Sequence, residues 1–459
     1  MNPLRGHSVD ESDQPAAAEN ATRAPAAQAL RTDPASIETL ARHAASCADH
    51  DDWPAAESAW RSLLSLRPHA IVALTGLAIA LREQERWTES LAAFRTATAA
   101  HPQIAAAQFN LGTCLLACNE AREAVATLRT ALALDPSPET RFNLALAFLK
   151  SGAFKTGALA YEARWQAEWR GKERPFSGRR WTGAALPADE PLLLWGEQGI
   201  GDEIMFSSLV AAATTRAGGP VFLECAPRLE PLFRRSFPGI EVVARTTTPD
   251  PRLPSEAAQS PLGSLPGALW PATGAPPVAG AFLRADPVRV ATLRAELTAL
   301  GPGRKVGIAW RGGHPAAKRP RVIPPEAWPR LFGSGDSIPV CLQHGPEPAE
   351  LAALERALGR TVHRIASVDP LVDMDAFAAL IAALDGVVAV DNSTVHLAGA
   401  LGAPAAVLLG FESDWRWGVD GVPCPWYSCV VRLRQKAPRD WTEPMAAAAE
   451  FIRQLQANA

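Results

Sequence analysis

A glycine-rich segment, WGEQGIGDE at 195–203, follows an apolar run and is the first place where the residue types suggest chemistry. Three glycines in six residues let a backbone turn tightly and approach a ligand closely. The helix that we expect from about Asp202 begins with an electropositive end that suits an anion. The spacing G-x-x-G-x-G differs from the dinucleotide fingerprint G-x-G-x-x-G, which argues against a nicotinamide enzyme.

The carboxylate of Asp202 in this segment has two interpretations. As an N-cap of the helix it would contribute about 1 kcal/mol to stability, and from these residues alone this is the simpler interpretation. Facing a cleft, the same carboxylate could remove a proton from an acceptor hydroxyl or amide. Both interpretations stay open at this point.

A second candidate site is VDNSTVHLAGALG at 390–402. An apolar strand delivers Asp391 and Asn392 to its carboxyl end. Asn392, Ser393 and Thr394 then cap a helix whose free amides can hold a diphosphate. Asp391 can accept hydrogen bonds from sugar or ribose hydroxyls. His396 lies on the same helix face as Asn392, either as a packed residue or as a ligand contact.

A third candidate is a basic loop around Gly312 and Gly313, just past an apolar strand at 306–310. Cations around two glycines can form a phosphate cradle, although a solvated basic loop is the commoner role of such a run. The potential cations are Arg311, His314, Lys318, Arg319 and Arg321.

The elements that must position these loops are short apolar runs that alternate with helical stretches, over 192–243 and again over 306–409. Such alternation predicts two parallel sheets with right-handed crossovers, and ligands then bind beyond the carboxyl ends of the strands. We therefore predict two Rossmann-like halves facing a cleft, at 191–300 and at 301–459 with a C-terminal helix. Eight prolines make 245–280 a loop-rich stretch.

Upstream, three prolines stand 34 residues apart, at Pro68, Pro102 and Pro136, and a fourth unit at 142–165 is one residue shorter. Aligning on the prolines places large residues in one column and small residues in another. These are Trp60, Phe94 and Leu128, then Ala56, Ser90 and Ala124. This period resembles the tetratricopeptide repeat (TPR) over about 36–170 and predicts an α-solenoid that holds another macromolecule, whereas chance spacing in an ordinary helical bundle would not align these columns.

Composition excludes several classes of protein. The 459 residues carry a net charge of −3, which argues against a general nucleic-acid binder. Seven cysteines without a C-x-x-C pair indicate a reducing compartment. We expect a disordered tail at 1–35 without a secretory signal, a linker at 171–190, no membrane span and a cytoplasmic location.

Residues 191–445 resemble the bacterial glycosyltransferases of the heptosyltransferase-like group, family 9, in the version fused behind TPR repeats. The matching segments are LLLWGEQGIGDEIMF, VGIAW with the glycine pair after it, VAVDNSTVHLAGALGAP, DWRW and PWY. The resemblance implies a GT-B fold and an inverting, metal-independent transfer from a nucleotide sugar. The nucleotide sugar is then a substrate held mainly by the C-terminal half, and no cofactor is expected.

Carried over by position, the resemblance makes Asp202 the catalytic base and Lys318 the diphosphate cation. The other residues that contact the donor are Asp391, Asn392, Ser393, His396, Gly312 and Gly313. The residues of the acceptor-side loop are Glu197, Gly199 and Gly201. Asn392 stands where threonine or alanine is usual, Glu203 stands where a neutral residue is common, and His344 replaces a frequent lysine. The loop at Lys318 is also shorter than usual. These departures leave the donor open and are compatible with a weakened or lost activity.

The preferred hypothesis is a glycosyltransferase whose TPR groove recruits a protein or polymer acceptor. Flagellin is a candidate by resemblance alone, since some bacterial fusions of this kind modify it. The alternative is a TPR adaptor with a degenerate GT-B domain, and a GT-B-fold epimerase is disfavoured by the fused repeats. Trp415, Trp417 and Trp426 either stack on a ligand or pack between the two halves, and packing is the favoured interpretation.

Overall fold

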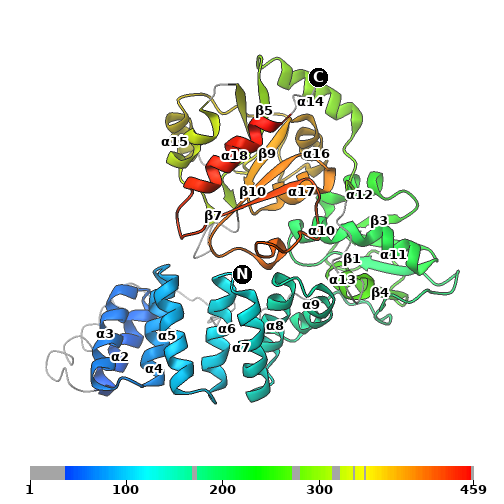
Figure 1. Ribbon diagram of the computed structural model, residues 1–459. Helices are drawn as coiled ribbons and strands as arrows, with labels where there is room; N and C mark the ends of the chain where they lie inside the picture. The colour runs from blue at the N-terminus through cyan, green and yellow to red at the C-terminus, as the bar shows by residue number, and fades with distance from the viewer. Residues whose placement is uncertain are drawn as a thin grey trace, which may run out of the picture. The chain divides into compact units, whose positions relative to one another are not determined.

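The computed structural model describes residues 37–167, 173–270, 280–312, 321–333, 336–345 and 348–455 (Figure 1). The predicted tail at 1–35 lies outside these residues. Contacts divide the chain into a helical unit, Met1–Ser151 with Ala160–Arg170, and an α/β unit, Gly152–Leu159 with Gly171–Ala459. Each unit is described by itself below.

The helical unit is a stack of antiparallel hairpins, in which each helix packs on the next one along the chain. Its helices are α2 (Ile37–Asp49), α3 (Trp53–Leu66), α4 (Ile71–Glu83), α5 (Trp87–Ala100), α6 (Ala105–Ala117), α7 (Ala121–Leu134) and α8 (Pro138–Lys150), followed by the 3-10 turn η1 (Tyr161–Trp165). The periodic prolines lie in the connections between hairpins, where no helical N–H is needed. The predicted α-solenoid of repeats is confirmed.

The two predicted columns form the contacts between helices. Trp60, Phe94 and Leu128 are buried, and the small residues four positions before them have no exposed surface. Gly112 shows why small residues are needed, because a Cβ there would lie 2.5 Å from Cγ of Leu128. The alternation of large and small residues therefore sets how closely successive helices approach.

The turn inside each hairpin repeats with the same period. Asp51, Glu85 and Asn119 adopt positive φ angles of 56°, 61° and 64° at intervals of 34 residues. The corresponding turn of the fourth unit uses Gly152, 33 residues after Asn119, with a φ of 88°. The residue that the fourth unit lacks is therefore missing before this turn, not after it.

The N-terminal sheet of the α/β unit is fully parallel, in the order β3-β2-β1-β4. Its strands are β1 (Leu192–Trp195), β2 (Val221–Cys225), β3 (Glu241–Ala244) and β4 (Ala258–Pro261). Its helices are α10 (Ile200–Phe206), α11 (Val210–Ala217), α12 (Glu230–Ser236) and α13 (Leu265–Leu269), with 3-10 turns η2 (Ser207–Leu209), η3 (Pro227–Leu229) and η4 (Leu262–Ser264). Helix α9 (Phe154–Ala160) contributes Phe154, which packs edge-on against Trp270 at 5.6 Å.

The structure gives detail to two sequence expectations for this half. The loop-rich stretch at 245–280 also contains β4 and α13. Two of its prolines stand where prolines are tolerated, Pro261 at a strand end and Pro266 in the first turn of a helix. The predicted linker is packed structure over 173–190. It runs beside β4, with the Trp181 amide donating to the Gln259 carbonyl at 2.8 Å, and it buries Trp181.

The C-terminal sheet is also parallel, in the order β11-β10-β9-β5-β8. Its strands are β5 (Arg304–Ala309), β8 (Ser337–Cys341), β9 (Gly386–Val390), β10 (Ala405–Leu409) and β11 (Val430–Arg434), with a separate two-stranded ribbon of β6 (Arg311–Gly312) and β7 (Arg321–Val322). Its helices are α14 (Pro287–Thr298), α15 (Pro348–Leu358), α16 (Met374–Ala383), α17 (Ser393–Leu401) and α18 (Thr442–Gln454), with 3-10 segments η5 (Pro325–Phe332) and η6 (Trp415–Trp417).

This half is covered by helices from widely separated segments. Residues of α15, η5 and α18 share one hydrophobic core with the strands, whereas α17 packs on β9 and β10. Helix α14 packs on α16, so the chain joins the C-terminal half before the expected boundary at 300. The apolar run at 362–365 forms only a bridge, between His363 and Val340.

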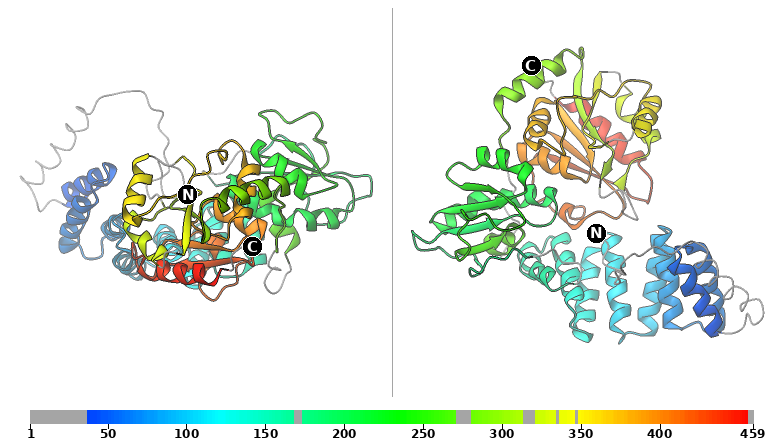
Figure 2. Two further views of the ribbon diagram at one scale, coloured as in Figure 1. Left: turned by 90° about the horizontal axis from the view of Figure 1, so that it is seen from above. Right: turned by 180° about the vertical axis from the view of Figure 1, so that it is seen from behind.

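The strand orders place two topological switch points in the α/β unit. In the N-terminal sheet the order reverses between β1 and β4, and in the C-terminal sheet it reverses between β5 and β9. Ligands of open parallel sheets bind beyond the carboxyl ends of the strands at such points. The loops after β1 and β9 hold the first two candidate sites. Figure 2 shows the two sheets as separate bodies, as predicted.

No helix among the described residues combines the length and the apolar composition needed to cross a bilayer.

Candidate active site

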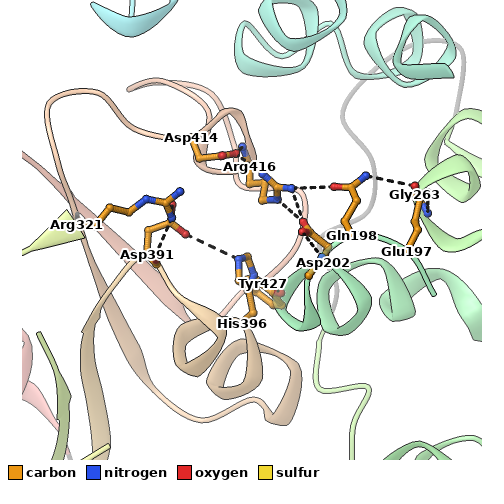
Figure 3. A network of polar contacts seen from close by, with 11 residues as sticks. Glu197, Gln198, Asp202, Gly263, Arg321, Asp391, His396, Asp414, Arg416 and Tyr427 are labelled. Carbon is orange, nitrogen blue, oxygen red and sulfur yellow. Dashed lines mark hydrogen bonds and ion pairs between the residues drawn. The ribbon is translucent and has the colours of Figure 1, made fainter. Parts of the chain in front are cut away.

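The loop after β1 places Asp202 in the first turn of α10, but not as its N-cap. Gly199 is the N-cap residue, and its backbone N–H donates to Oδ2 of Asp202 at 3.3 Å. The other oxygen, Oδ1, accepts from Nε of Arg416 at 2.7 Å (Figure 3). Asp202 therefore holds the helix start with one oxygen and an arginine of the other half with the second.

Glu197 joins the two loops of the N-terminal switch point. Its Oε1 accepts from the backbone N–H of Gly263, which follows β4, at 3.1 Å. A Cβ at Gly263 would collide with the same carboxylate, so the close approach requires glycine. Glu197 is buried, and the contact gives this predicted loop residue a positioning role.

Glu203 is buried beside the site and paired within the N-terminal half. Its carboxylate accepts from the backbone N–H of Ala226 and from Nη2 of Arg245, both at 2.7 Å. Burial raises the pKa of Glu203, and the Arg245 guanidinium opposes this shift. Nη1 of Arg245 also donates to the Gly196 carbonyl at 2.7 Å, so this departure from the family pattern ties down the glycine-rich loop.

The start of α17 confirms Asn392 as a capping residue but not Ser393. Asn392 is the N-cap, and its Oδ1 accepts from the Thr394 N–H at 3.0 Å, while Ser393 is the first helical residue. A Cβ at Gly312 would lie 2.7 Å from the Asp391 carbonyl oxygen, so this glycine allows β6 to approach the end of β9. Gly312 and the capping residues therefore lie together at the C-terminal switch point.

Asp391 forms an ion pair at this switch point. Its Oδ2 accepts from Nη1 of Arg321 at 2.6 Å, and its carbonyl accepts from the same nitrogen at 2.8 Å. Asp391 raises the pKa of Arg321 against the opposing effect of burial, and Asp414 and Asp202 act in the same direction. These carboxylates from both halves thus belong to one charged cluster, which we define as Asp202, Asp391, Asp414, Arg321 and Arg416.

His396 is a packed residue as well as a neighbour of Asp391. Its ring stacks on Trp417 with centroids 5.1 Å apart, and its Nδ1 lies 2.9 Å from the Tyr427 hydroxyl. Nε2 lies 3.9 Å from Oδ1 of Asp391. A Cβ at Gly201 would lie 3.1 Å from the His396 ring, so this glycine lets α10 approach α17. Gly201, predicted as an acceptor-loop residue, thus contacts the C-terminal half.

Burial lowers the pKa of His396 below its ordinary value of 6.5, although Asp391 opposes the shift. The unfolded chain therefore binds a proton at this residue more readily than the folded chain does. Folding stability from this group is present above about pH 6.5 and is lost as the pH falls, by at most about 1.4 kcal/mol per pH unit. We expect His396→Gln to flatten the pH dependence of the unfolding free energy between pH 7 and pH 5, measured by urea denaturation.

The matched control is Tyr427→Phe, which removes the hydrogen-bonding hydroxyl but leaves His396 buried. This variant should lose stability at every pH and keep the wild-type slope. An unchanged slope in His396→Gln would show that another group governs the acid side.

Arg416 and Asp414 are functional candidates that sequence reasoning did not single out. Arg416 lies in η6, and its Nη1 and its backbone N–H both donate to Oδ1 of Asp414, at 2.7 and 3.0 Å. Although burial acts to raise it, the guanidinium of Arg416 holds the pKa of Asp414 below its ordinary value, assisted by Arg321. The available signal was an acid and an arginine two positions apart in DWRW, shortly after a predicted strand.

Trp415, Trp417 and Trp426 are packed residues, and Trp426 lies between the two halves as the favoured interpretation predicts, whereas the ring partners of Trp417 belong to the C-terminal half. Trp426 contacts two aromatic residues of the N-terminal half, Phe206 edge-on at 5.5 Å and Trp270 at 5.1 Å. Trp415 lies 6.3 Å from Trp426, and Trp417 stacks on His396. All three tryptophans are buried.

Two predicted donor contacts, Gly313 and Lys318, lie outside the described residues. Among the residues that the structure does describe, no group of three or more His, Cys, Asp or Glu side chains is placed to hold a metal ion. A cavity of about 390 Å³ lies at the amino ends of β5 and β8, lined by residues such as Arg304, Arg330 and Ser337. None of the predicted site residues lines it.

Comparison with known proteins agrees with this architecture. Residues 75–117 and 119–173 match the tetratricopeptide repeat, and residues 324–438 match glycosyltransferase family 9 (heptosyltransferase). Protein FlbA of Caulobacter vibrioides is 33% identical over 333 residues, which are 69% of this chain and 55% of FlbA. The chain thus spans about half the length of this relative.

Two solved structures show similarity over about a third of the chain. MamA from Desulfovibrio magneticus RS-1 is 19% identical with a TM-score of 0.31, covering 33% of this chain and 86% of MamA. A thermophilic TPR protein of Thermus thermophilus is 23% identical with a TM-score of 0.28, covering 33% of this chain and 83% of that protein. From the sequence matches and the two parallel sheets, the chain carries tetratricopeptide repeats in its N-terminal part and a glycosyltransferase family 9 domain of GT-B type in its C-terminal part.

Proposed function

We propose that the protein transfers a sugar from a nucleotide-sugar donor to a protein or polymer acceptor that its repeats recruit. The observation that carries this proposal is the charged cluster, in which Asp202 and Asp391 come from the switch points of two different sheets. Each carboxylate stands where a ligand of a parallel sheet binds. Flagellin is the acceptor that we propose, on the resemblance alone.

The reaction is a direct displacement at the anomeric carbon, with inversion and without a metal ion. Asp202 takes the proton of the acceptor hydroxyl as the hydroxyl oxygen attacks the anomeric carbon. The bond from that carbon to the diphosphate oxygen breaks, and the nucleoside diphosphate leaves. The N-terminal amides of α17 and Arg321 stabilise the departing negative charge, and Lys318 is the diphosphate cation that the resemblance implies. Asp391 and His396 contact the donor, and Asn392 and Ser393 shape the helix start.

A panel of nucleotide sugars tests donor recognition by isothermal titration calorimetry. We expect the protein to bind at least one donor and Asp391→Ala to weaken that binding by about tenfold or more, which corresponds to about 1.4 kcal/mol. Asp336→Ala is the matched control, because Asp336 is exposed and precedes β8, at the amino end of a strand of the same sheet. Failure of the whole panel to bind, or equal binding by Asp391→Ala and the wild type, would reject the proposal.

A further inference from the structure

We propose that Arg416 is a donor-binding residue whose guanidinium exchanges its partner, from the Asp202 carboxylate to the diphosphate of the donor. The inference rests on the proposed function and assigns this site a cation from the C-terminal half. It also implies an order of events, because the donor must bind before Asp202 is free to accept a proton.

Arg416 is preorganised to bind an anion. Its Nη1 and its backbone N–H share one oxygen of Asp414, which fixes the side chain against its own turn. The guanidinium carbon lies 4.9 Å above the ring of Trp415, and the side chain is only 14% exposed. The edge formed by Nε and Nη2 points away from this anchor. A planar guanidinium edge of this kind matches the geometry of phosphate oxygens.

The present partner of that edge is the candidate base. Nε donates to Oδ1 of Asp202 at 2.7 Å, and Nη2 contacts the same oxygen. Nη2 also donates to Oε1 of Gln198 at 3.3 Å, within the glycine-rich loop. Oδ2 of Asp202 accepts from the Gly199 N–H, so each carboxylate oxygen of Asp202 accepts a hydrogen bond from the protein. The hydroxyl of the sugar acceptor would have to share an Asp202 oxygen with one of these N–H groups.

The exchange resolves this conflict by electrostatics. A diphosphate carries more negative charge than one carboxylate, so it competes well for a guanidinium in a partly buried site. Asp414 keeps the arginine in place during the exchange because its contacts use Nη1 and the backbone, not the Nε edge. Oδ1 of Asp202 then loses its hydrogen bond from Arg416 and can accept a proton. The Arg416–Asp202 contact between the two halves therefore depends on whether the nucleotide sugar is bound.

The probe for this competition is inorganic pyrophosphate, titrated into the full-length protein at constant ionic strength. We expect Asp202→Asn to tighten pyrophosphate binding about fivefold to tenfold, because the competitor for Arg416 is gone. Arg416→Gln should weaken binding at least tenfold. The double variant should bind like Arg416→Gln, because the gain from Asp202→Asn requires the arginine.

The double variant separates competition from a general loss of negative charge. If Asp202→Asn tightens binding equally with and without Arg416, the effect is long-range electrostatics and the inference is wrong. Arg416→Lys is the second variant in case Arg416→Gln does not fold, since lysine keeps a charge for Asp414 but lacks the Nε edge. It should also bind pyrophosphate more weakly than the wild type.

The outcomes for the inference and for the proposed function are distinct. If pyrophosphate binds no form, or if Asp202→Asn does not tighten it, the inference fails even where the donor panel shows binding and transfer. If the pyrophosphate cycle behaves as expected but no nucleotide sugar binds, the proposed function fails while Arg416 remains an anion-binding residue.

Discussion

Asp202→Asn is expected to remove sugar transfer almost completely, with kcat lower by about 10²–10⁴-fold, the usual contribution of a general base. Asparagine has nearly the same shape and keeps an oxygen that can accept the Gly199 N–H, so α10 should start as in the wild type. The amide cannot accept the acceptor proton. The measurement is kcat and donor KM with the donor and acceptor identified by the binding panel and by mass spectrometry of modified proteins.

The matched control for this variant is Asp250→Asn, which makes the same chemical change at a surface ion pair with Arg252 in the N-terminal half. It should keep the wild-type kcat. Donor KM in Asp202→Asn should not rise, since the proposal assigns Asp202 to the acceptor. If Asp202→Asn transfers sugar as fast as the wild type, another group is the base. If neither protein transfers any sugar and cellular function is intact in both, the adaptor alternative stands.

The repeats were predictable because their signal is periodic and local. The spacing of Pro68, Pro102 and Pro136 and the buried columns aligned with them follow from one constraint, that each hairpin packs only on its neighbours. The left-handed turn residues Asp51, Glu85 and Asn119 share this period but not a residue type, and the turn was therefore not recognised.

The sheets were predictable where strands are apolar on both faces. Strands β1, β5, β9 and β10 have almost entirely buried residues and read as continuous hydrophobic runs. Strand β4 reads AQSP and β11 reads VVRLR. Polar side chains interrupt both hydrophobic runs, so the pattern did not predict these strands. In β4 the polar residues are satisfied by partners distant in sequence, such as Trp195, whose Nε1 donates to Oε1 of Gln259 at 2.8 Å.

The candidate site was only half predictable for a similar reason. Residues that cap a helix, such as Asn392, act on neighbours two positions away, so their role is written in the local sequence. The contact between Arg416 and Asp202 spans 214 residues and joins two sheets. A single sequence gives no signal for such a pair, because each residue has a plausible local partner as well.

Trp426→Ala is expected to destabilise the α/β unit by about 3–5 kcal/mol, the usual cost of removing a buried aromatic side chain. Trp426 is 1% exposed and is packed between Phe206 and Trp270, which both belong to the N-terminal half. The cavity would therefore open where the two halves meet. We expect chemical denaturation, followed by fluorescence and by hydrogen exchange, to show the two halves unfolding in separate transitions.

Two control variants separate the interface from ordinary core packing. Trp328→Ala removes an equally buried tryptophan that lies inside the core of the C-terminal half alone. It should cost a similar free energy without uncoupling the halves, so protection of the N-terminal strands should persist until that half itself unfolds. Trp426→Phe should be mild, because Nε1 of Trp426 has no hydrogen-bond partner among the described residues and only packing is lost. Trp426→Ala could instead unfold in a single cooperative transition, with protection lost equally in both sheets. That result would mean that the charged cluster and the packing of α10 on α17 couple the halves without this tryptophan.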